Sequence, residues 1–167
     1  MEALENSSLD RQTTASIAFK KEVQELRRRL QGSGKEHADL DKRLKHIKKA
    51  VQLYPGAELS WMKAVKAAEN ISHATKIKLY GDMHKSKRDV ETIPGTAYRV
   101  ENIVWNTWYS TADPTTTNKE QFALATEEYQ SIRKDLDRFK TEVLALESKL
   151  DDQNILYTPG RKNWKEE

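Results

Sequence analysis

Four histidines are the side chains of this chain best suited to bind a metal ion or to transfer protons near neutral pH. They are His37, His46, His73 and His84. They fall on three different expected elements, and none has the His-Glu-x-x-His spacing that places two imidazoles beside one zinc ion. His37 lies within an apolar helical pattern, where a partly buried, hydrogen-bonded imidazole is expected. The histidines therefore predict no metal site.

Two pairs of adjacent carboxylates are the next candidates, as the acid and base of a hydrolase. They are Glu127 with Glu128 and Asp151 with Asp152. Adjacent residues on a helix point in different directions, so the two carboxyl groups of a pair do not face one substrate. The sequence also shows no Ser-His-Asp constellation, and Gly-Ser-Gly-Lys at 32–35 lacks the spacing of a phosphate-binding loop. We therefore predict no catalytic residue and no cofactor.

Cations cluster in the first third of the chain, at 27–29 and again over 42–49. Such runs can bind nucleic acid or an anionic membrane surface. However, the interleaved Leu44 and Ile47 continue the apolar pattern of a helix, and the acidic segment 118–153 offers carboxylates within the same chain. We therefore expect the basic face to be solvated or paired internally, and we expect no nucleic-acid partner.

Four tryptophans could stack on a sugar or dock on another protein: Trp61, Trp105, Trp108 and Trp164. Trp105 and Trp108 are three residues apart and share a helical face, so we expect at least one of them in the core. Trp105 lies at the edge of that face and is the candidate for exposure. Packing in the core or against another domain is the favoured interpretation, and an aromatic ligand surface is the alternative. The predicted docking surface consists of Trp105, Trp108, Tyr157 and Trp164.

The element that must organise these residues is a helix expected over about 117–153. Its apolar residues recur at steps of three and four, the seam of a heptad helix, at Phe122, Ala125, Tyr129, Ile132, Leu136, Phe139, Val143, Leu146 and Leu150. Thr117 and Glu120 are expected to form its capping box. Such a helix needs partner helices, because burial of the apolar stripe supplies most of its stability.

A second long helix is expected from about 11 to 53, after a flexible lead-in over 1–10. Its seam reaches Leu40 from Leu30 without losing phase, although two glycines lie between these leucines. A turn would have no reason to preserve this spacing. We therefore favour one continuous helix, and two helices broken at 32–35 are the alternative.

Shorter segments connect the two long helices. Tyr54-Pro55-Gly56 ends the first helix, and further helices are expected over about 57–80 and 96–109. Residues 82–95 form the longest expected loop. The tail over 155–167 is expected to be extended and to pack on the rest of the chain.

Composition supports an all-α fold and narrows the class of protein. The 167 residues are 37% hydrophobic and 33% charged, with six Gly, four Pro and no Cys. These values are typical of helices with wide solvated faces, and they exclude disulfides and thiolate metal sites. No apolar run approaches the roughly 18 residues of a membrane span, and the polar first ten residues predict no signal peptide. We expect an elongated antiparallel bundle of three or four main helices, a single domain over 11–164 that is monomeric or weakly dimeric.

Two short blocks are more specific than the helical pattern. Residues 108–115 read Trp-Tyr-Ser-Thr-Ala-Asp-Pro-Thr and resemble a His-Trp-x-Ser-Thr-x-x-Pro-Thr block. Residues 157–161 resemble a terminal Tyr-Thr-Pro-Gly-Arg block, and residues 54–57 resemble a Pro-Gly-Ala hinge between two helices. From about 13 to 164 the chain thus resembles the C-terminal helical domain of bacterial sortilin-like, BNR (Asp-box) repeat β-propeller proteins of a glycosyl hydrolase family.

The resemblance implies a non-catalytic helical accessory domain that follows a β-propeller in a longer, secreted, extracytoplasmic protein, with that propeller as its partner. Any carbohydrate-processing residues of the family would lie in the propeller blades, so none carries over to this chain. The chain departs from the family at Asn106-Thr107, which replaces a Gly- or His-bearing stretch, and at 32–34, which interrupts a plainer helix. A free-standing coiled-coil module for protein–protein interaction is the alternative function.

Overall fold

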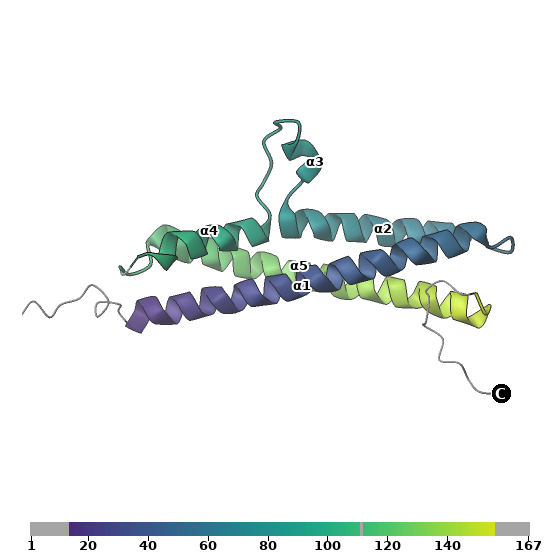
Figure 1. Cartoon of the computed structure of the whole chain (residues 1–167), viewed down its shortest axis with the longest axis horizontal. Helices are drawn as coiled ribbons and strands as arrows, with labels where there is room; N and C mark the ends of the chain where they lie inside the picture. Colours follow the sequence, from purple (N-terminus) through teal and green to yellow (C-terminus); the bar gives the residue numbers. More distant parts are fainter. Residues whose placement is uncertain (1–13, 111, 156–167) are drawn as a thin grey trace, which may run out of the picture. The chain divides into compact units, whose positions relative to one another are not determined.

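The computed structural model describes residues 14–110 and 112–155. These residues form five α-helices and no strand: α1 (Thr14–Leu53), α2 (Leu59–Tyr80), α3 (Met83–Ser86), α4 (Thr96–Trp108) and α5 (Thr116–Asp152) (Figure 1). The prediction of an all-α, antiparallel bundle of three or four main helices is confirmed, and the number of main helices is four. Where the ends of the main helices are described, they fall within two residues of the expected bounds.

The helices pack into two compact units, each with a hydrophobic core of its own. Of the described residues, unit 1 comprises those up to Ser33 together with Ile77–Ile132, and unit 2 comprises Gly34–Lys76 and those from Arg133 onward. Helices α1, α2 and α5 therefore contribute residues to both units. The expectation of a single domain stays a prediction.

Helix α1 passes through its two glycines without a break. Apart from Gly34, its buried residues keep the spacing of three and four from one end to the other: Ser16, Phe19, Val23, Leu26, Leu30, Ser33, His37, Leu40, Leu44, Ile47 and Val51. Between Leu30 and Leu40, Ser33 and His37 occupy the two positions at which the apolar pattern lapses. The favoured prediction of one continuous helix is therefore confirmed.

The core of unit 1 is built from four helices: Phe19, Val23, Leu26 and Leu30 of α1, Leu79 of α2, Val100, Ile103 and Val104 of α4, and Ala125 and Ile132 of α5. The Phe19 and Phe122 rings meet edge to face, with centroids 5.5 Å apart. Lys20 Nζ donates to the Ser110 carbonyl, and Arg27 Nε donates to Glu101 on α4. Going along α1 from Lys20 to Arg27, the partner residue moves back along the chain from Ser110 to Glu101, so α1 and α4 run antiparallel.

The core of unit 2 combines α1, α2 and α5, with Leu40, Leu44, Ile47, Val51, Val65, Ala68, Leu136, Phe139, Val143, Leu146 and Leu150 buried together. Trp61 packs half-buried against this core, and its ring stacks on Tyr54 with centroids 6.0 Å apart. Helix α2 runs antiparallel to α1, whereas α5 runs parallel to it, as two ion pairs show: Arg133 with Glu36 and Arg43 with Glu147. Helix α2 in unit 2 and α4 in unit 1 thus both run antiparallel to α1, and the first and last helices lie side by side.

Helix α5 begins one residue earlier than expected and uses a different cap. The Asn118 N–H donates to Thr115 Oγ1 at 3.2 Å, and the Lys119 N–H donates to the Thr115 carbonyl at 3.1 Å. Thr115 is therefore the N-cap residue. The predicted capping box of Thr117 and Glu120 is wrong, because both residues already lie inside the first turns of the helix.

The loop expected over 82–95 contains the one-turn helix α3, which stands away from α4 in Figure 1. Gly81 ends α2, with a φ of +83° that favours glycine. A Cβ on Gly95 would collide with the backbone of Gly81 and of Tyr80. The two ends of the loop therefore meet at a contact that only glycine permits.

Replacing Gly32 by Ala is expected to stabilise the protein. Gly32 is exposed inside α1, and a Cβ built on it meets no atom within 4 Å. Because alanine is favoured over glycine by about 1 kcal/mol inside a helix, the melting temperature should rise by about 2–4 °C. Thermal unfolding followed by circular dichroism measures this. Gly95→Ala is the control and should lower the melting temperature; a decrease in Gly32→Ala would contradict the continuous helix.

Candidate functional site

The predicted docking residues that the structure describes lie on α4 and are exposed to solvent. Trp105 is 67% exposed and Trp108 is 62% exposed. Tyr109, which directly follows the helix, is also exposed. Tyr157 and Trp164, the other two predicted residues, lie outside the described residues.

Neither tryptophan of α4 is in the core, so the expectation that at least one would be buried is wrong. The buried residues of α4 are Thr96, Val100, Ile103, Val104 and Thr107. Their spacing already completes one helical stripe, and each residue turns the helix by roughly 100°. Trp105 therefore lies almost opposite the core, and Trp108 lies on its flank. Shared spacing placed the tryptophans near each other but did not identify the buried face.

The segment after α4, which belongs to the block 108–115, is tied to the start of α1. Lys20 Nζ donates to the Ser110 carbonyl at 2.8 Å, and Ser16 Oγ donates to the Ala112 carbonyl at 3.3 Å. Thr115 then caps α5. The described residues of this block thus form the connection from α4 into α5 and hold it against α1 within unit 1.

A groove of about 720 Å³ lies between α1 and α4 in unit 1. Ile17, Val104 and Trp108 supply apolar surface to it. Val104 belongs to the core, whereas Ile17 is 40% exposed and therefore offers uncovered apolar surface beside Trp108. The groove thus combines a packed floor with an apolar end open to solvent.

Cations dominate the charge of this groove. Its lining includes Lys20, Lys21, Arg27 and Arg28, with Glu25 as the carboxylate among them. All five residues come from α1. The groove therefore carries an excess of positive charge.

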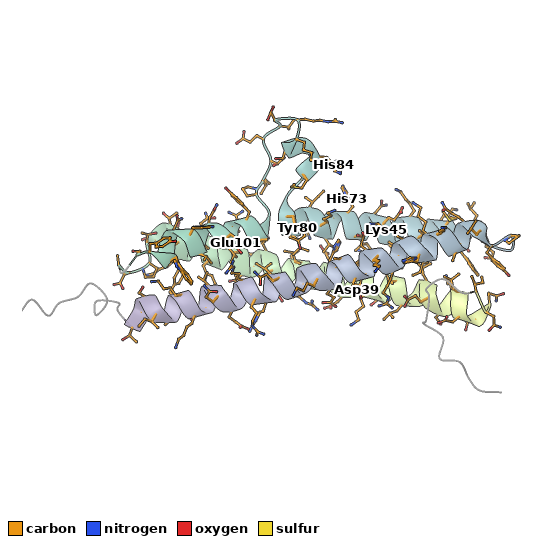
Figure 2. All side chains as sticks on the ribbon, in the orientation of Figure 1. Asp39, Lys45, His73, Tyr80, His84 and Glu101 are labelled. Carbon is orange, nitrogen blue, oxygen red and sulfur yellow. The ribbon has the colours of Figure 1, made fainter. Side chains whose placement is uncertain are left out.

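Ion pairs hold two of these cations in place. Arg27 Nε donates to Glu101 Oε1 at 2.7 Å, and Figure 2 labels Glu101 on α4. Arg28 and Arg29 both donate to the Glu25 carboxylate at 2.9 Å. The hydrogen bond from Arg28, followed by that from Arg29, lowers the pKa of Glu25 to about 2. Glu25 is therefore ionised at neutral pH and orients the neighbouring guanidinium groups.

A buried polar cluster in unit 2 was not predicted from the sequence. His37 on α1 is 4% exposed, and its Nε2 lies 3.0 Å from the Ser72 carbonyl and 3.1 Å from Ser72 Oγ. Ser72 Oγ donates to Asp41 Oδ1 at 3.0 Å. The imidazole also packs against the Phe139 ring, with centroids 5.7 Å apart. The predicted hydrogen-bonded, at least partly buried His37 is confirmed, and its partner on α2 is identified.

This cluster contains the residue types of a serine hydrolase triad, but its donors and acceptors are arranged differently. The Ser72 carbonyl can only accept a hydrogen bond, so Nε2 of His37 carries the proton. It therefore cannot remove the proton of Ser72 Oγ, which is instead donated to Asp41. The arrangement links α1 to α2 and does not activate a nucleophile.

The carboxylate of this cluster stays ionised although it is partly buried. Burial by itself raises the pKa of Asp41, but hydrogen bonds from Lys45 and Ser72 and the charges of Lys45 and His37 outweigh it. The pKa of Asp41 is therefore lowered from its ordinary value. Figure 2 labels Lys45, which lies one helical turn beyond Asp41 on α1. The Asp41–Lys45 pair thus faces outward from the His37–Ser72 contact.

Glu147 on α5 is a buried charge, with 1% of its surface exposed. Arg43 on α1 donates two hydrogen bonds to it, Nε to Oε1 at 2.8 Å and Nη2 to Oε2. Such pairing is required, because a buried carboxylate without a cation loses several kcal/mol of solvation. The pair fixes α1 against α5 within unit 2. Sequence reasoning missed it, because Glu147 follows a seam residue and resembles a solvated glutamate.

The basic runs of α1 are paired within the chain to a large extent, as expected. The ion pairs are Arg27–Glu101, Arg28–Glu25, Arg29–Glu25, Arg43–Glu147, Lys45–Asp41 and Lys48–Glu69. Of these carboxylates only Glu147 lies on α5, so the acidic last helix supplies a smaller share of the partners than expected. The absence of a nucleic-acid partner stays a prediction.

The remaining histidines do not join His37. Figure 2 shows His73 on α2 and His84 on α3, and both are exposed. Within the described residues, no three His, Cys, Asp or Glu side chains lie close enough together to hold a metal ion. No helix between residues 14 and 155, in the parts described, has both the length and the apolar character needed to cross a bilayer.

Comparison with known proteins gives no assignment. No protein-family model, no curated protein and no solved structure matches the chain. The resemblance to the helical domain of propeller proteins therefore stays a prediction.

Replacing Arg43 by Ala is expected to lower the free energy of unfolding by about 3 kcal/mol, because it leaves the Glu147 carboxylate buried without a cation. Urea unfolding at neutral pH measures the change. The matched control is Lys45→Ala, which removes the mainly exposed Lys45 ammonium from Asp41, a carboxylate that keeps its hydrogen bond from Ser72, and should cost less than about 1 kcal/mol. Equal losses in the two variants would contradict the role given to Glu147.

The Glu25 carboxyl group is expected to titrate near pH 2 rather than near 4.5. Because its pKa is lowered in the folded state, the stability it contributes is present above the ordinary glutamate pKa and is lost as the pH falls through the lowered value. Carbon-13 NMR of the side-chain carboxyl follows the titration. An Arg28→Ala, Arg29→Ala double variant should restore the ordinary midpoint, and an unchanged midpoint in that variant would disprove the assigned cause.

Proposed function

We propose that this chain is a non-catalytic helical accessory domain that binds another protein domain through exposed aromatic residues on α4 and at its C-terminal end. The residues are Tyr98, Trp105 and Tyr109, which we call the α4 aromatic surface. They follow one another at steps of seven and four, so they lie on one side of the helix. This side is opposite the buried stripe of α4.

The exposure of these rings is the observation that carries the proposal. Tyr98 is 59% exposed, Trp105 is 67% exposed and Tyr109 is 81% exposed. Large aromatic side chains left in water on one helical face are typical of surfaces that bind a protein partner. Each ring would bury a large area on binding at a small cost in side-chain entropy, because it has few rotatable bonds.

The resemblance supplies the proposed partner. The block over 108–115, which resembles the propeller proteins, begins beside Trp105 and includes Tyr109. The same stretch of chain therefore carries both the resemblance and part of the exposed surface. We accordingly propose the β-propeller domain of a secreted parent protein as the partner, with any carbohydrate-processing chemistry in the propeller.

A free-standing coiled-coil module is the second candidate function, and the burial of the α5 seam counts against it. Ile132, Leu136, Phe139 and Val143 are fully buried in the two cores of the chain itself. A homodimer through this seam would need these side chains to be available to another copy. The seam therefore supports the accessory domain over the coiled-coil module.

The α4 aromatic surface is expected to carry the binding energy for a propeller domain encoded in the same reading frame. The double variant Tyr98→Ala, Trp105→Ala should weaken binding of the separately produced propeller at least tenfold, since exposed aromatic anchors dominate such interfaces. Isothermal titration calorimetry measures the affinity. The melting temperature of the variant should be unchanged, because both side chains are exposed.

Leu124→Ala is the control, since Leu124 is 41% exposed on α5, and it should change the affinity less than twofold. Equal binding of the aromatic double variant and the unaltered chain would contradict the proposed surface. A reading frame without a propeller would contradict the proposed partner. A concentration-dependent dimer in sedimentation equilibrium would favour the coiled-coil module.

A further inference from the structure

We propose that the groove between α1 and α4 binds an acidic amphipathic helix from another protein. This goes beyond the proposed function, because the groove is a different surface from the α4 aromatic surface. The two surfaces share no residue: the groove takes Trp108 from α4, whereas Tyr98, Trp105 and Tyr109 do not line it. Its occupant can therefore differ from the partner of the aromatic surface.

The wall that α1 provides has the spacing of a helix-packing surface. The lining residues Ile17, Lys21, Gln24, Arg28 and Gln31 follow one another at steps of four and three. This is the spacing at which helices pack side by side. The stripe covers about 21 Å of helix axis at 1.5 Å per residue. An occupant that matches it is a helix of about four turns, lying along α1.

The charge of the groove specifies acidic residues on the occupant. Lys21 and Arg28 lie on the stripe, with Lys20 and Arg27 beside it towards α4. Arg28 is held by Glu25 in an exposed pair, and exposed pairs exchange partners at little cost. Among the described residues, the Lys21 ammonium has no carboxylate partner. Carboxylates of an incoming helix would complement these cations and orient the helix in the groove.

The apolar end of the groove sets the direction of the occupant. Ile17 and Trp108 are 40% and 62% exposed. They lie at the same end, because α4 runs antiparallel to α1 and the Lys20 ammonium reaches the Ser110 carbonyl there. A large apolar side chain of the occupant would cover both. The occupant therefore has its apolar anchor at the Ile17 end and its carboxylates along Lys21 and Arg28.

An acidic peptide fits this groove better than a nucleic acid does. Nucleic-acid affinity depends on neutralising many phosphates with cations. Here Arg27 is engaged by Glu101, and the ionised Glu25 carboxylate lies among the remaining cations. A phosphate backbone would leave Ile17 exposed, whereas an amphipathic helix covers the apolar end and pairs its carboxylates with the cations of the groove.

The experiment uses the full chain and a fluorescein-labelled synthetic peptide of about 18 residues, long enough to span the stripe. The peptide is helical, carries glutamates on one face and has a leucine and a phenylalanine at one end. Fluorescence anisotropy at low salt measures its affinity. The same peptide with every glutamate replaced by glutamine should bind at least tenfold more weakly. A single-stranded oligonucleotide of the same net charge should also bind more weakly than the acidic peptide.

Variants locate the binding. Lys21→Glu with Arg28→Glu should weaken peptide binding at least tenfold, and Trp108→Ala should weaken it about fivefold. Lys63→Glu with Lys140→Glu is the matched control, because both lysines are exposed in unit 2 and lie outside the groove; it should change the affinity less than twofold. Circular dichroism melts verify that each variant is folded.

Three results would overturn the proposal: no binding of the acidic peptide, undiminished binding by the groove double variant, or tighter binding of the oligonucleotide. The test is separate from that of the proposed function. Tyr98→Ala with Trp105→Ala should leave peptide binding unchanged, and the groove double variant should leave propeller binding unchanged. Failure of one proposal therefore does not imply failure of the other.

Discussion

The regular spacing of buried side chains along α1 and α5 is the constraint on which the rest of the structure depends. These helices have 40 and 37 residues, and each buries a single stripe. A long amphipathic helix is stable only where its stripe is covered. In unit 2 the cover comes from α2, and in unit 1 it comes mainly from α4. The shorter helices α2 and α4 therefore serve to cover the apolar stripes of the two long helices.

Features that depend on spacing within one helix could be predicted from the sequence. Contacts between residues far apart in the sequence could not. The seams and the burial of His37 follow from periodicity within one helix. The bond from Ser72 to Asp41 and the pair of Arg43 with Glu147 join residues 31 and 104 positions apart. Such contacts depend on which faces of two helices meet, and no short-range signal encodes that. The α4 tryptophans were misplaced because β-branched residues, rather than the largest apolar ones, complete its buried stripe.

Helix α4 links the fold to both proposed surfaces. It has only 13 residues, and one buried stripe and several polar contacts hold it in unit 1. Arg27 reaches Glu101 from α1, and the Thr96 hydroxyl donates to Glu128 of α5 at 2.8 Å. Because the core needs a single face of α4, the remaining faces are available, one for the aromatic residues and one for the wall of the groove. The buried stripe and the polar contacts of α4 therefore fix the helix in place, and the helix in turn positions its exposed side chains.

Gly81 and Gly95 are in contact at the two ends of the segment that joins α2 to α4, so the fold of unit 1 and the segment between the glycines have different requirements. The chain leaves α2 and re-enters α4 at nearly the same point, so unit 1 depends on the two glycines and hardly on the length of what they enclose. Changes of sequence in this segment should therefore be tolerated by the fold of unit 1. By the same reasoning, it is the place in the chain where a foreign peptide or a whole domain can be grafted.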